Sequence, residues 1–153
     1  MPFTHQPTMV CGLDIIPNKN TINNTNNTSN KFIQGFTASF NQTFSRYISL
    51  CEDIDSREKI KLKNCMIEAL TNFSLINKIF PKHVILMLEG GQSYSKVKKL
   101  TENIVKQIKE SFEELKLEFI IKITIIMINK KNNLRIFSHE STDYNNPIPG
   151  MLI

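Results

Sequence analysis

The chain has 153 residues, a mass of 17.7 kDa and a net charge of +5, from 19 Lys and Arg against 14 Asp and Glu. This length suits one domain, and the hydrophobic fraction of 41% is too high for a disordered chain. With 5 glycines and 6 prolines, the composition excludes a fibrous or low-complexity protein. Three scattered cysteines, an odd number, argue against a disulfide framework and for a reducing compartment.

The first segments of the chain have the pattern of β-strands. Met9–Ile16 is typical of a buried strand that contains one carboxylate, Asp14. The Asn-rich range 17–31 has no periodicity and predicts a flexible loop. Phe32–Phe40 and Phe44–Leu50 then predict two strands of a hairpin joined by a short polar turn.

A helix is predicted over Ser56–Ile79, where apolar residues recur at steps of three and four. Ser56 is the expected N-cap, and Glu58 would favour the first turn. Pro81 prevents the helix from continuing. Cys65 falls at a core position of this helix, so we expect it to serve packing.

The second half of the chain alternates strand and helix patterns. The continuous apolar run His83–Leu88 predicts a central parallel strand covered on both faces, which ends at Glu89. Val97–Leu115 predicts a second amphipathic helix, and Phe119–Ile128 predicts another long strand. A turn after that strand leads into Leu134–Phe137 and predicts a second hairpin.

The predicted order is therefore β-β-β-α-β-α-β-β, with an irregular tail over 138–153. An antiparallel meander followed by βαβ crossovers gives an α/β fold with one mixed sheet and helices packed on it.

Features for export or membrane insertion are missing from the sequence. The N-terminus lacks the basic and long apolar regions of a signal peptide. The longest apolar stretch, Phe119–Ile128, contains Lys122 and Thr124 and is shorter than the roughly 20 residues that span a bilayer. We therefore expect an intracellular protein, cytoplasmic or nuclear, that is neither secreted nor associated with a membrane.

Two carboxylates in or next to apolar strands are the first candidates for chemistry. A carboxylate in a buried strand, such as Asp14, is costly unless it is paired or binds a cation. If its strand neighbours the one that ends at Glu89, the two side chains converge beyond the carboxyl ends of the strands. Such carboxylates hold Mg²⁺ or Mn²⁺ for attack on a phosphodiester. The alternative is that Asp14 merely ends its strand and Glu89 begins a solvated turn.

Lysines at the start of both predicted helices are candidates for contact with phosphates. Lys96, Lys98 and Lys99 open the second helix, and Lys59, Lys61 and Lys63 open the first. Basic helix faces attract polyanions through their phosphate groups. The alternative for any one of these lysines is an ordinary solvated helix face.

Four segments, in order along the chain, resemble motifs of the Piwi domain of Argonaute/Piwi proteins. Pro7-Thr-Met-Val-Cys-Gly-Leu-Asp14 is similar to the opening strand of that domain, and Gln34-Gly-Phe-Thr-Ala-Ser-Phe-Asn41 to the strand that follows. Pro81-Lys-His-Val-Ile-Leu-Met-Leu-Glu-Gly90 resembles a later strand that ends in Arg-Asp-Gly. Asn146-Pro-Ile-Pro-Gly150 resembles a later N-x-P-x-G segment. The resemblance covers nearly the whole chain.

The resemblance implies an RNase H-like fold that holds a small guide RNA paired to a target RNA. In active members, two aspartates, a glutamate and a later His or Asp bind two metals and cut the target. By resemblance, Asp14 matches the first aspartate, and Glu89 stands at the second, with Leu88 in place of the preceding arginine. Glu58 is the best match for the glutamate, and Glu52 is the fallback.

Two departures from the family pattern weaken the expectation of cleavage. Glutamate instead of aspartate at position 89 adds one methylene to a site whose geometry has narrow tolerance. The fourth ligand would lie well beyond Gly150, and none of the three histidines takes its place. We expect residues 1–153 to be one partial Piwi domain, truncated at its C-terminal end.

Three functions follow as expectations. The favoured one is a Piwi-like fragment that takes part in small-RNA-guided RNA binding in gene silencing without cleavage. The second is a metal-dependent, RNA-guided endonuclease that uses Asp14, Glu58 and Glu89 with Mg²⁺ or Mn²⁺. The third is a non-catalytic interaction remnant or the product of a pseudogene.

Overall fold

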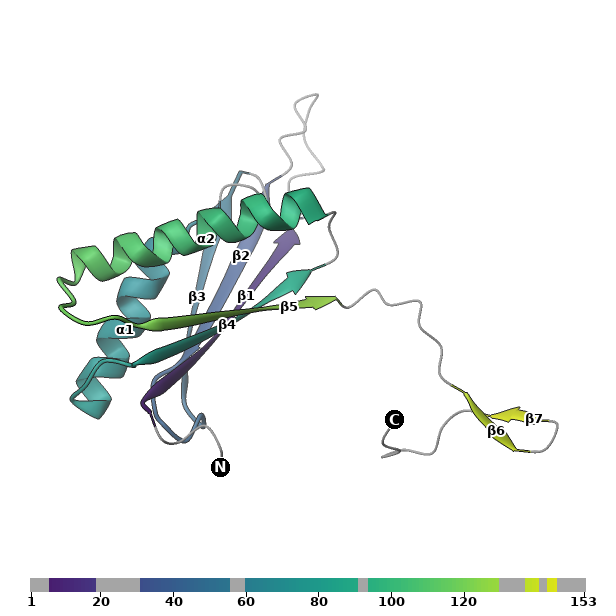
Figure 1. The fold of residues 1–153 in the computed structure, drawn as a ribbon. Helices are drawn as coiled ribbons and strands as arrows, with labels where there is room; N and C mark the ends of the chain where they lie inside the picture. The colour runs from purple at the N-terminus through teal and green to yellow at the C-terminus, as the bar shows by residue number, and fades with distance from the viewer. Residues whose placement is uncertain are drawn as a thin grey trace, which may run out of the picture.

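The computed structural model describes residues 6–18, 31–55, 60–90, 94–129, 137–140 and 143–145. Five strands form one sheet in the order β3-β2-β1-β4-β5, and two short strands form a second sheet (Figure 1). The strands of the large sheet are β1 (Thr8–Pro17), β2 (Phe32–Ser39), β3 (Tyr47–Ile54), β4 (His83–Gly90) and β5 (Lys122–Asn129). The helices are α1 (Lys63–Asn77) and α2 (Tyr94–Glu114). The predicted α/β architecture is confirmed.

The large sheet is mixed, as the order of elements predicts. β1 pairs antiparallel with β2, and β2 pairs antiparallel with β3, which completes the meander. β4 pairs parallel with both β1 and β5, across the connections that contain the helices. The prediction of a central parallel strand at β4 is therefore confirmed.

The polar turn between β2 and β3 is held by the side chain of Asn41. Its Oδ1 accepts hydrogen bonds from the backbone N–H groups of Ser45 and Arg46, both at 3.1 Å. Phe44 takes a left-handed conformation with φ of 54°, and this local bonding stabilises the turn. β3 consequently begins at Tyr47, three residues later than predicted.

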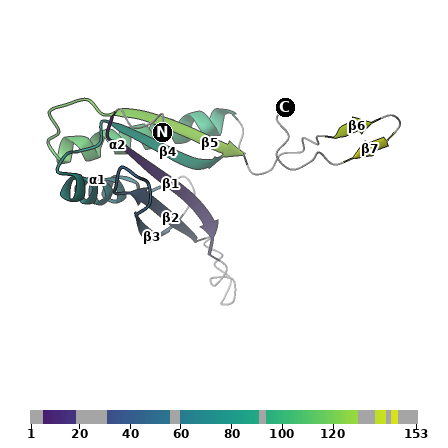
Figure 2. The same ribbon diagram turned by 90° about the horizontal axis from the view of Figure 1, so that it is seen from below.

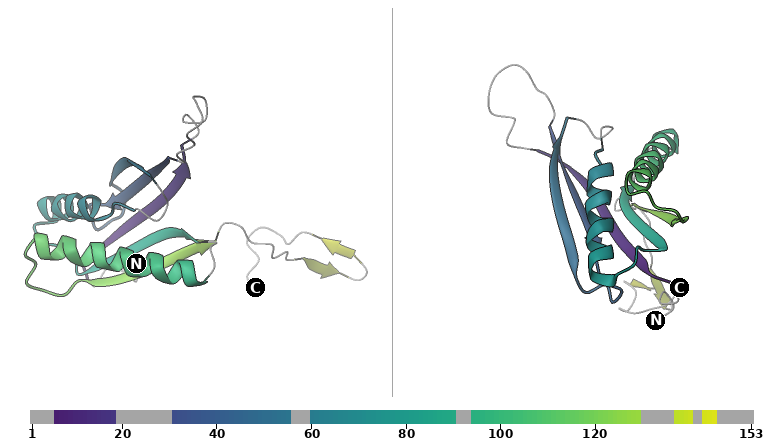
Figure 3. Two further views of the ribbon diagram at one scale, coloured as in Figure 1. Left: turned by 90° about the horizontal axis from the view of Figure 1, so that it is seen from above. Right: turned by 90° about the vertical axis from the view of Figure 1, so that its left-hand side faces the viewer.

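Both helices cover the same face of the large sheet. The strands lie in front of the helices from below (Figure 2), and the helices lie in front from above (Figure 3, left). Alternate strand residues face the helices and form one buried cluster with both of them, including Leu13, Phe36, Leu86, Leu70 and Ile104.

The opposite face, which we call the open face, carries no helix among the described residues. Met87 of β4 and Ile128 of β5 are 36% and 42% exposed there. The prediction that β4 is covered on both faces is therefore wrong for the described part of the chain. The apolar run reflects its central place in the sheet, where both edges are paired.

α1 begins at Lys63, seven residues later than predicted, and Ser56 is not its N-cap. Leu62 is the N-cap and makes no side-chain cap bond. Oε1 of Gln107, on α2, instead accepts from the N–H groups of Leu62 and Lys63 at 2.7 and 3.2 Å. A glutamine from another helix thus accepts hydrogen bonds from the backbone N–H groups at the start of α1. In most helices the side chain of the N-cap residue accepts them.

The segment before α1 is also fixed by a second glutamine, Gln34, which is buried. Gln34 of β2 is 1% exposed, and its amide pairs with the backbone of Lys61. Oε1 accepts from the Lys61 N–H at 2.9 Å, and Nε2 donates to the Lys61 carbonyl at 2.8 Å. Nε2 of Gln107 donates to the carbonyl of Ile60 at 2.8 Å. These bonds hold 60–63 in a non-helical course.

Two of the predicted segments differ from the structure, and others lie mostly outside the described residues. β5 begins at Lys122 rather than at Phe119. Two short strands, β6 (Ser138–Glu140) and β7 (Asp143–Asn145), lie where the sequence predicts an irregular tail. Most of the predicted loop 17–31 and of the predicted strand Leu134–Phe137 lie outside the described residues, as does Glu58. Neither described helix combines the length and apolar content needed to cross a membrane.

Candidate functional site

Asp14 and Glu89 lie on neighbouring parallel strands at the same end of the sheet. The β1–β4 register ends with Leu13 opposite Leu88, so Asp14 and Glu89 are the next residue on each strand. Adjacent strands are about 4.8 Å apart, which brings the two backbones close together. Leu13 and Leu88 face the helices, so by alternation both carboxylates lie on the open face. The condition that the sequence set for convergence, that the two strands are neighbours, is met.

The carboxylates belong to a row of residues that crosses all five strands. Cys51 of β3 is opposite Gly35 of β2, and Gly35 is opposite Asp14. On the other side, Glu89 is opposite Ile128 of β5. A hollow of about 400 Å³ on the open face follows this row. Its lining includes all five of these residues, together with neighbouring residues on β1, β2, β3 and β4.

Two glycines keep the middle of this hollow free of side chains. A Cβ atom added at Gly35 would meet nothing within 4 Å, so the space beside Asp14 is open. A Cβ atom added at Gly12 would lie 3.2 Å from Cγ2 of Thr37. The Thr37 hydroxyl donates to the carbonyl of Ile48 at 3.0 Å, which fixes this wall. The backbone of β1 and β2 is therefore accessible to a ligand at this point.

Asp14 is held in place by its own strand. Its Oδ1 accepts a hydrogen bond from the N–H of Ile15 at 2.9 Å. The side chains of Asp14 and Glu89 are both partly exposed. Carboxylates at the rim of a hollow attract cations.

A three-carboxylate metal site is not assembled within the described ranges, which leave out Glu58. No group of three or more His, Cys, Asp or Glu side chains close enough for a metal occurs in them. Glu52, the fallback, faces the helices instead of the open face, because it is in register with buried Gln34. Its Oε1 lies 3.9 Å from Sγ of Cys65, on α1. The structure therefore separates Glu52 from Asp14.

The two carboxylates that do lie together fit one hard divalent cation. Mg²⁺ is bound in proteins through one or two carboxylates, with water and phosphate oxygens completing the octahedron. Asp14 and Glu89 supply that number of carboxylates. When bound, such a cation neutralises and orients a phosphate group.

The lysines predicted to contact phosphates differ in their surroundings. Lys98 and Lys99 are exposed on α2, whose N-terminal end lies near the ends of β1 and β4 that carry the carboxylates (Figure 1). The side chain of Lys96 lies outside the described part. Nζ of Lys63 contacts Oε2 of Glu114 at 2.7 Å, which ties α1 to α2. For Lys63 the structure supports a structural role.

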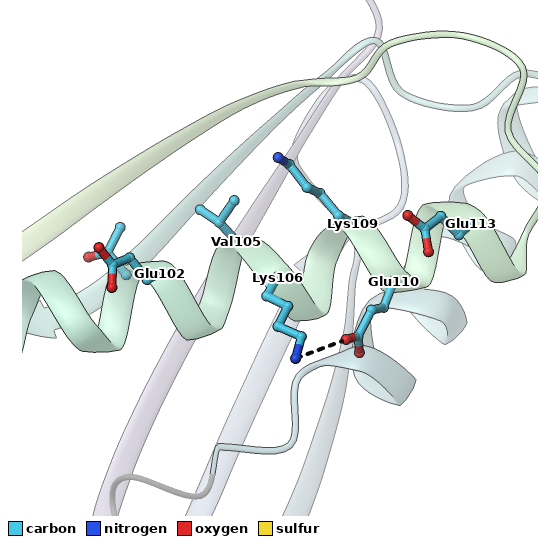
Figure 4. A pocket seen from close by; sticks show the side chains of 7 residues that line it. Glu102, Val105, Lys106, Lys109, Glu110 and Glu113 are labelled. Carbon is cyan, nitrogen blue, oxygen red and sulfur yellow. Dashed lines mark ion pairs between the residues drawn. The ribbon is translucent and has the colours of Figure 1, made fainter.

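A second hollow, of about 600 Å³, lies on the outer surface of α2 (Figure 4). Charges of both signs line it, and Lys106 and Glu110 form an ion pair at 3.9 Å. Its described lining residues all belong to α2, and none was predicted to carry chemistry. It does not coincide with the hollow at Asp14.

His83 lies at the other end of β4 from the carboxylates. Its ring Nε2 is 2.9 Å from the hydroxyl of Thr124. Burial, and secondarily the charge of Lys122, lowers the pKa of His83, so it is neutral at pH 7. Glu89 is six positions farther along β4, about 20 Å away, which keeps His83 out of the site.

Cys51 is the site residue that the sequence did not single out. It is exposed on the open face, whereas Cys11 and Cys65 are buried. Cys51 is opposite Gly35, and Gly35 is opposite Asp14. The sequence could therefore have placed Cys51 beside Asp14 only if the pairing of β3 with β2 and of β2 with β1 had been known.

We expect thiol alkylation to discriminate sharply among the three cysteines. Burial raises the pKa of Cys11, and burial with Glu52 and Glu68 raises the pKa of Cys65 to about 11. At pH 8 only about one molecule in a thousand then carries the Cys65 thiolate, the reactive form. Mass spectrometry after brief treatment with N-ethylmaleimide should find modification at Cys51 alone. Equal modification of Cys65 under native conditions would contradict the described packing.

Comparisons with known proteins agree on one family. The family model described as Piwi domain matches residues 1–153. The chain is 28% identical over 126 residues to the Piwi-like protein Ago3 of Bombyx mori, covering 81% of this chain and 14% of that protein. It therefore spans a small part of the length of this relative.

Solved structures show the same fold. The C-terminal lobe of a budding yeast Argonaute matches with a TM-score of 0.70 and 18% identity, over 88% of this chain and 27% of that one. Kluyveromyces polysporus Argonaute, solved with a guide RNA, matches with a TM-score of 0.67 and 16% identity, over 92% of this chain and 16% of that one. The predicted RNase H-like fold is thereby confirmed.

Proposed function

The chain belongs to the Piwi domain family, and on that premise we propose that it takes part in small-RNA-guided RNA binding without cleaving the RNA. The RNA backbone lies along the hollow of the open face, and guide and target RNA are the partners. The observation that carries this proposal is the placement of Asp14 and Glu89 beside an open glycine surface, which admits a phosphate group bridged by a divalent cation.

The number and length of the carboxylate side chains at the site disfavour cleavage of the RNA. Two described carboxylates suffice to hold one cation between protein and phosphate, whereas clamping the attacking and leaving oxygens takes two metals about 3.5–4 Å apart. Glutamate at position 89 also places its carboxylate one methylene farther from the strand than aspartate would. Such a site favours phosphate binding over the narrow geometry that cleavage requires.

Removing the charges of Asp14 and Glu89 should have opposite effects on the affinity for RNA in the absence and in the presence of Mg²⁺. In EDTA, Asp14→Asn with Glu89→Gln should tighten binding by about threefold to tenfold, because two charges that repel phosphate are removed. With Mg²⁺, the unmodified chain should bind more tightly than in EDTA, and the double variant should gain little. Fluorescence anisotropy with a labelled guide–target duplex at low salt measures both effects.

A matched control is available on α2. Glu102→Gln with Glu113→Gln removes the same two charges from the outer surface of the helix, away from the open face. This variant should keep the full response to Mg²⁺. Binding should also weaken as salt rises, because phosphate contacts release counterions. No binding by the unmodified chain at low salt would refute the proposal.

Metal-dependent cleavage by Asp14, Glu89 and Glu58 is the second candidate, and the adjacency of the first two residues favours it. Incubation of the guide-loaded chain with a complementary RNA and Mn²⁺ distinguishes the two functions. Our proposal expects no product above background. A product that appears with Mn²⁺ and disappears in Asp14→Ala would establish the endonuclease instead.

A further inference from the structure

The hollow on the open face has two chemically different ends. One end carries the carboxylates of Asp14 and Glu89, and the other end is bounded by β2 and β3. Two residues at this second end carry hydroxyl groups, Thr37 on β2 and Ser49 on β3, and they lie directly opposite each other. We call these two residues the hydroxyl wall. The proposed function uses the carboxylate end and gives the hydroxyl wall no role.

Hydrogen bonds fix the direction in which both hydroxyl groups of the wall donate. The Thr37 hydroxyl donates to the carbonyl oxygen of Ile48 at 3.0 Å. The Ser49 hydroxyl donates to Oγ1 of Thr37 at 3.4 Å. Each hydroxyl has one hydrogen to donate and two lone pairs that accept. Both hydrogens are therefore used within the wall, and Ser49, which is exposed, presents lone pairs to a ligand.

The hydroxyl wall suits a hydrogen-bond donor and does not suit a phosphate group. Phosphate oxygens are acceptors, so they would meet the lone pairs of Ser49 with no hydrogen between the two oxygens. Among the described residues that line this hollow, there is no lysine or arginine. A phosphate therefore finds a partner at the carboxylate end, through a cation, and a donating group of the same ligand finds one at the wall.

The two ends of the hollow are close enough for one nucleic-acid strand to reach both. Ser49 is opposite Thr37, and Thr37 is opposite Gly12, which is two residues before Asp14 on β1. Two strand spacings across the sheet and two residues along β1 separate the backbones of Ser49 and Asp14 by about 12 Å. A strand that lies across β1 and β2 covers this distance with a short run of nucleotides.

The floor between the two ends leaves room for a sugar ring. A Cβ atom added at Gly35 would meet nothing within 4 Å, so no side chain stands between Asp14 and β3 in that row. In the next row, Cγ2 of Thr37 lies 3.2 Å from the place of a Cβ atom at Gly12, so the Thr37 methyl group covers this glycine. Glycines in strands allow a ligand to approach the backbone closely.

We propose that Ser49 accepts a hydrogen bond from the 2′-hydroxyl of a ribose, and that this contact makes the hollow select RNA over DNA. The 2′-hydroxyl is the group that distinguishes the two nucleic acids, and it can donate. Thr37 is a positioning residue, because it holds the Ser49 hydrogen away from the ligand. The inference rests on the proposed function, since the ribose belongs to the strand held at Asp14 and Glu89.

The test removes the donor from the ligand and the acceptor from the protein, separately and together. Two labelled guide–target duplexes are compared, one with ribose and one with 2′-fluoro sugars, which keep the A-form shape of RNA but cannot donate. In fluorescence anisotropy with Mg²⁺ at low salt, the unmodified chain should bind the 2′-fluoro duplex about threefold to tenfold more weakly, the loss of one hydrogen bond. In Ser49→Ala, the two duplexes should bind with equal affinity.

Two variants serve as matched controls. Ser49→Thr keeps a hydroxyl at the same position and should keep the preference for the ribose duplex. Ser74→Ala removes a serine hydroxyl from α1, on the helix-covered side of the sheet, and should also keep it. Because Ser49 is exposed, Ser49→Ala should leave the melting temperature unchanged, which separates the loss of a contact from a loss of folding.

Cys51 reports whether the strand lies in the hollow. It is exposed, lies two residues from Ser49 on β3 and lines the same hollow. Bound ribose duplex should therefore slow the modification of Cys51 by N-ethylmaleimide, measured by mass spectrometry. Modification of Cys51 at an unchanged rate, with the duplex bound, would place the strand outside the hollow and overturn the inference.

The remaining outcomes separate this inference from the proposed function. If neither duplex binds at low salt, both fail. If both duplexes bind with equal affinity and protect Cys51, the role of Ser49 fails and the proposed function stands. A preference for ribose that persists unchanged in Ser49→Ala also overturns the role of Ser49. A preference that is lost in Ser49→Ala and kept in Ser49→Thr and Ser74→Ala supports it.

Discussion

Replacing Leu70 with alanine should lower the free energy of unfolding by about 2–5 kcal/mol. Leu70 is 0% exposed and lies in the cluster that joins α1, α2 and the sheet. The truncation removes buried methyl groups and leaves a cavity that rigid neighbours on three elements fill only in part. Urea denaturation followed by circular dichroism measures the loss as a lower transition midpoint.

Leu75 provides the same substitution in the same helix. It is 62% exposed, so Leu75→Ala should change the free energy of unfolding by no more than about 0.5 kcal/mol. Equal losses at Leu70 and Leu75 would mean that α1 packs on the sheet through a different face from the one described.

Replacing Gln34 with alanine should cost about 2–4 kcal/mol. The amide of Gln34 makes two hydrogen bonds to the backbone of Lys61, and both backbone groups lose their partner in the variant. Each unsatisfied buried group costs about 1–3 kcal/mol, and the cost falls where water reaches the exposed Lys61. Hydrogen exchange should therefore speed up at the Lys61 amide before it does in the strands.

Gln42→Ala is the control, because Gln42 is exposed in the turn after β2. It should leave stability within about 0.5 kcal/mol of the unmodified chain. If Gln34→Ala is equally mild and the Lys61 amide stays protected, the course of 60–63 must be held by Gln107 alone.

Periodicity in the sequence was enough to predict the α/β fold, with the apolar run of β4 as a central parallel strand. It predicted the meeting of Asp14 and Glu89 only on the condition that their strands are neighbours. The pairing of β1 with β4 in the structure meets that condition. The burial of Cys65 likewise followed from its place in the helical pattern.

The remaining features depend on contacts between distant residues. The start of α1 depends on Gln107, a residue more than forty positions away, so no local capping signal marks it. The side of the sheet that Glu52 faces depends on its register with Gln34, which a shift of one residue would reverse. The place of Cys51 in the site depends on two registers at once.

The pairing of β1 with β4 has a consequence for how the protein is made. Thr8 pairs with His83, so β1 cannot pair with β4, its second neighbouring strand, until α1 and most of β4 have left the ribosome. Until then the meander leaves one edge of β1 unpaired, and the β1 side chains that later join the buried cluster are uncovered. Pairing over such a separation is slow. Synthesis therefore passes through a stage at which the first strand is open to aggregation or to a chaperone.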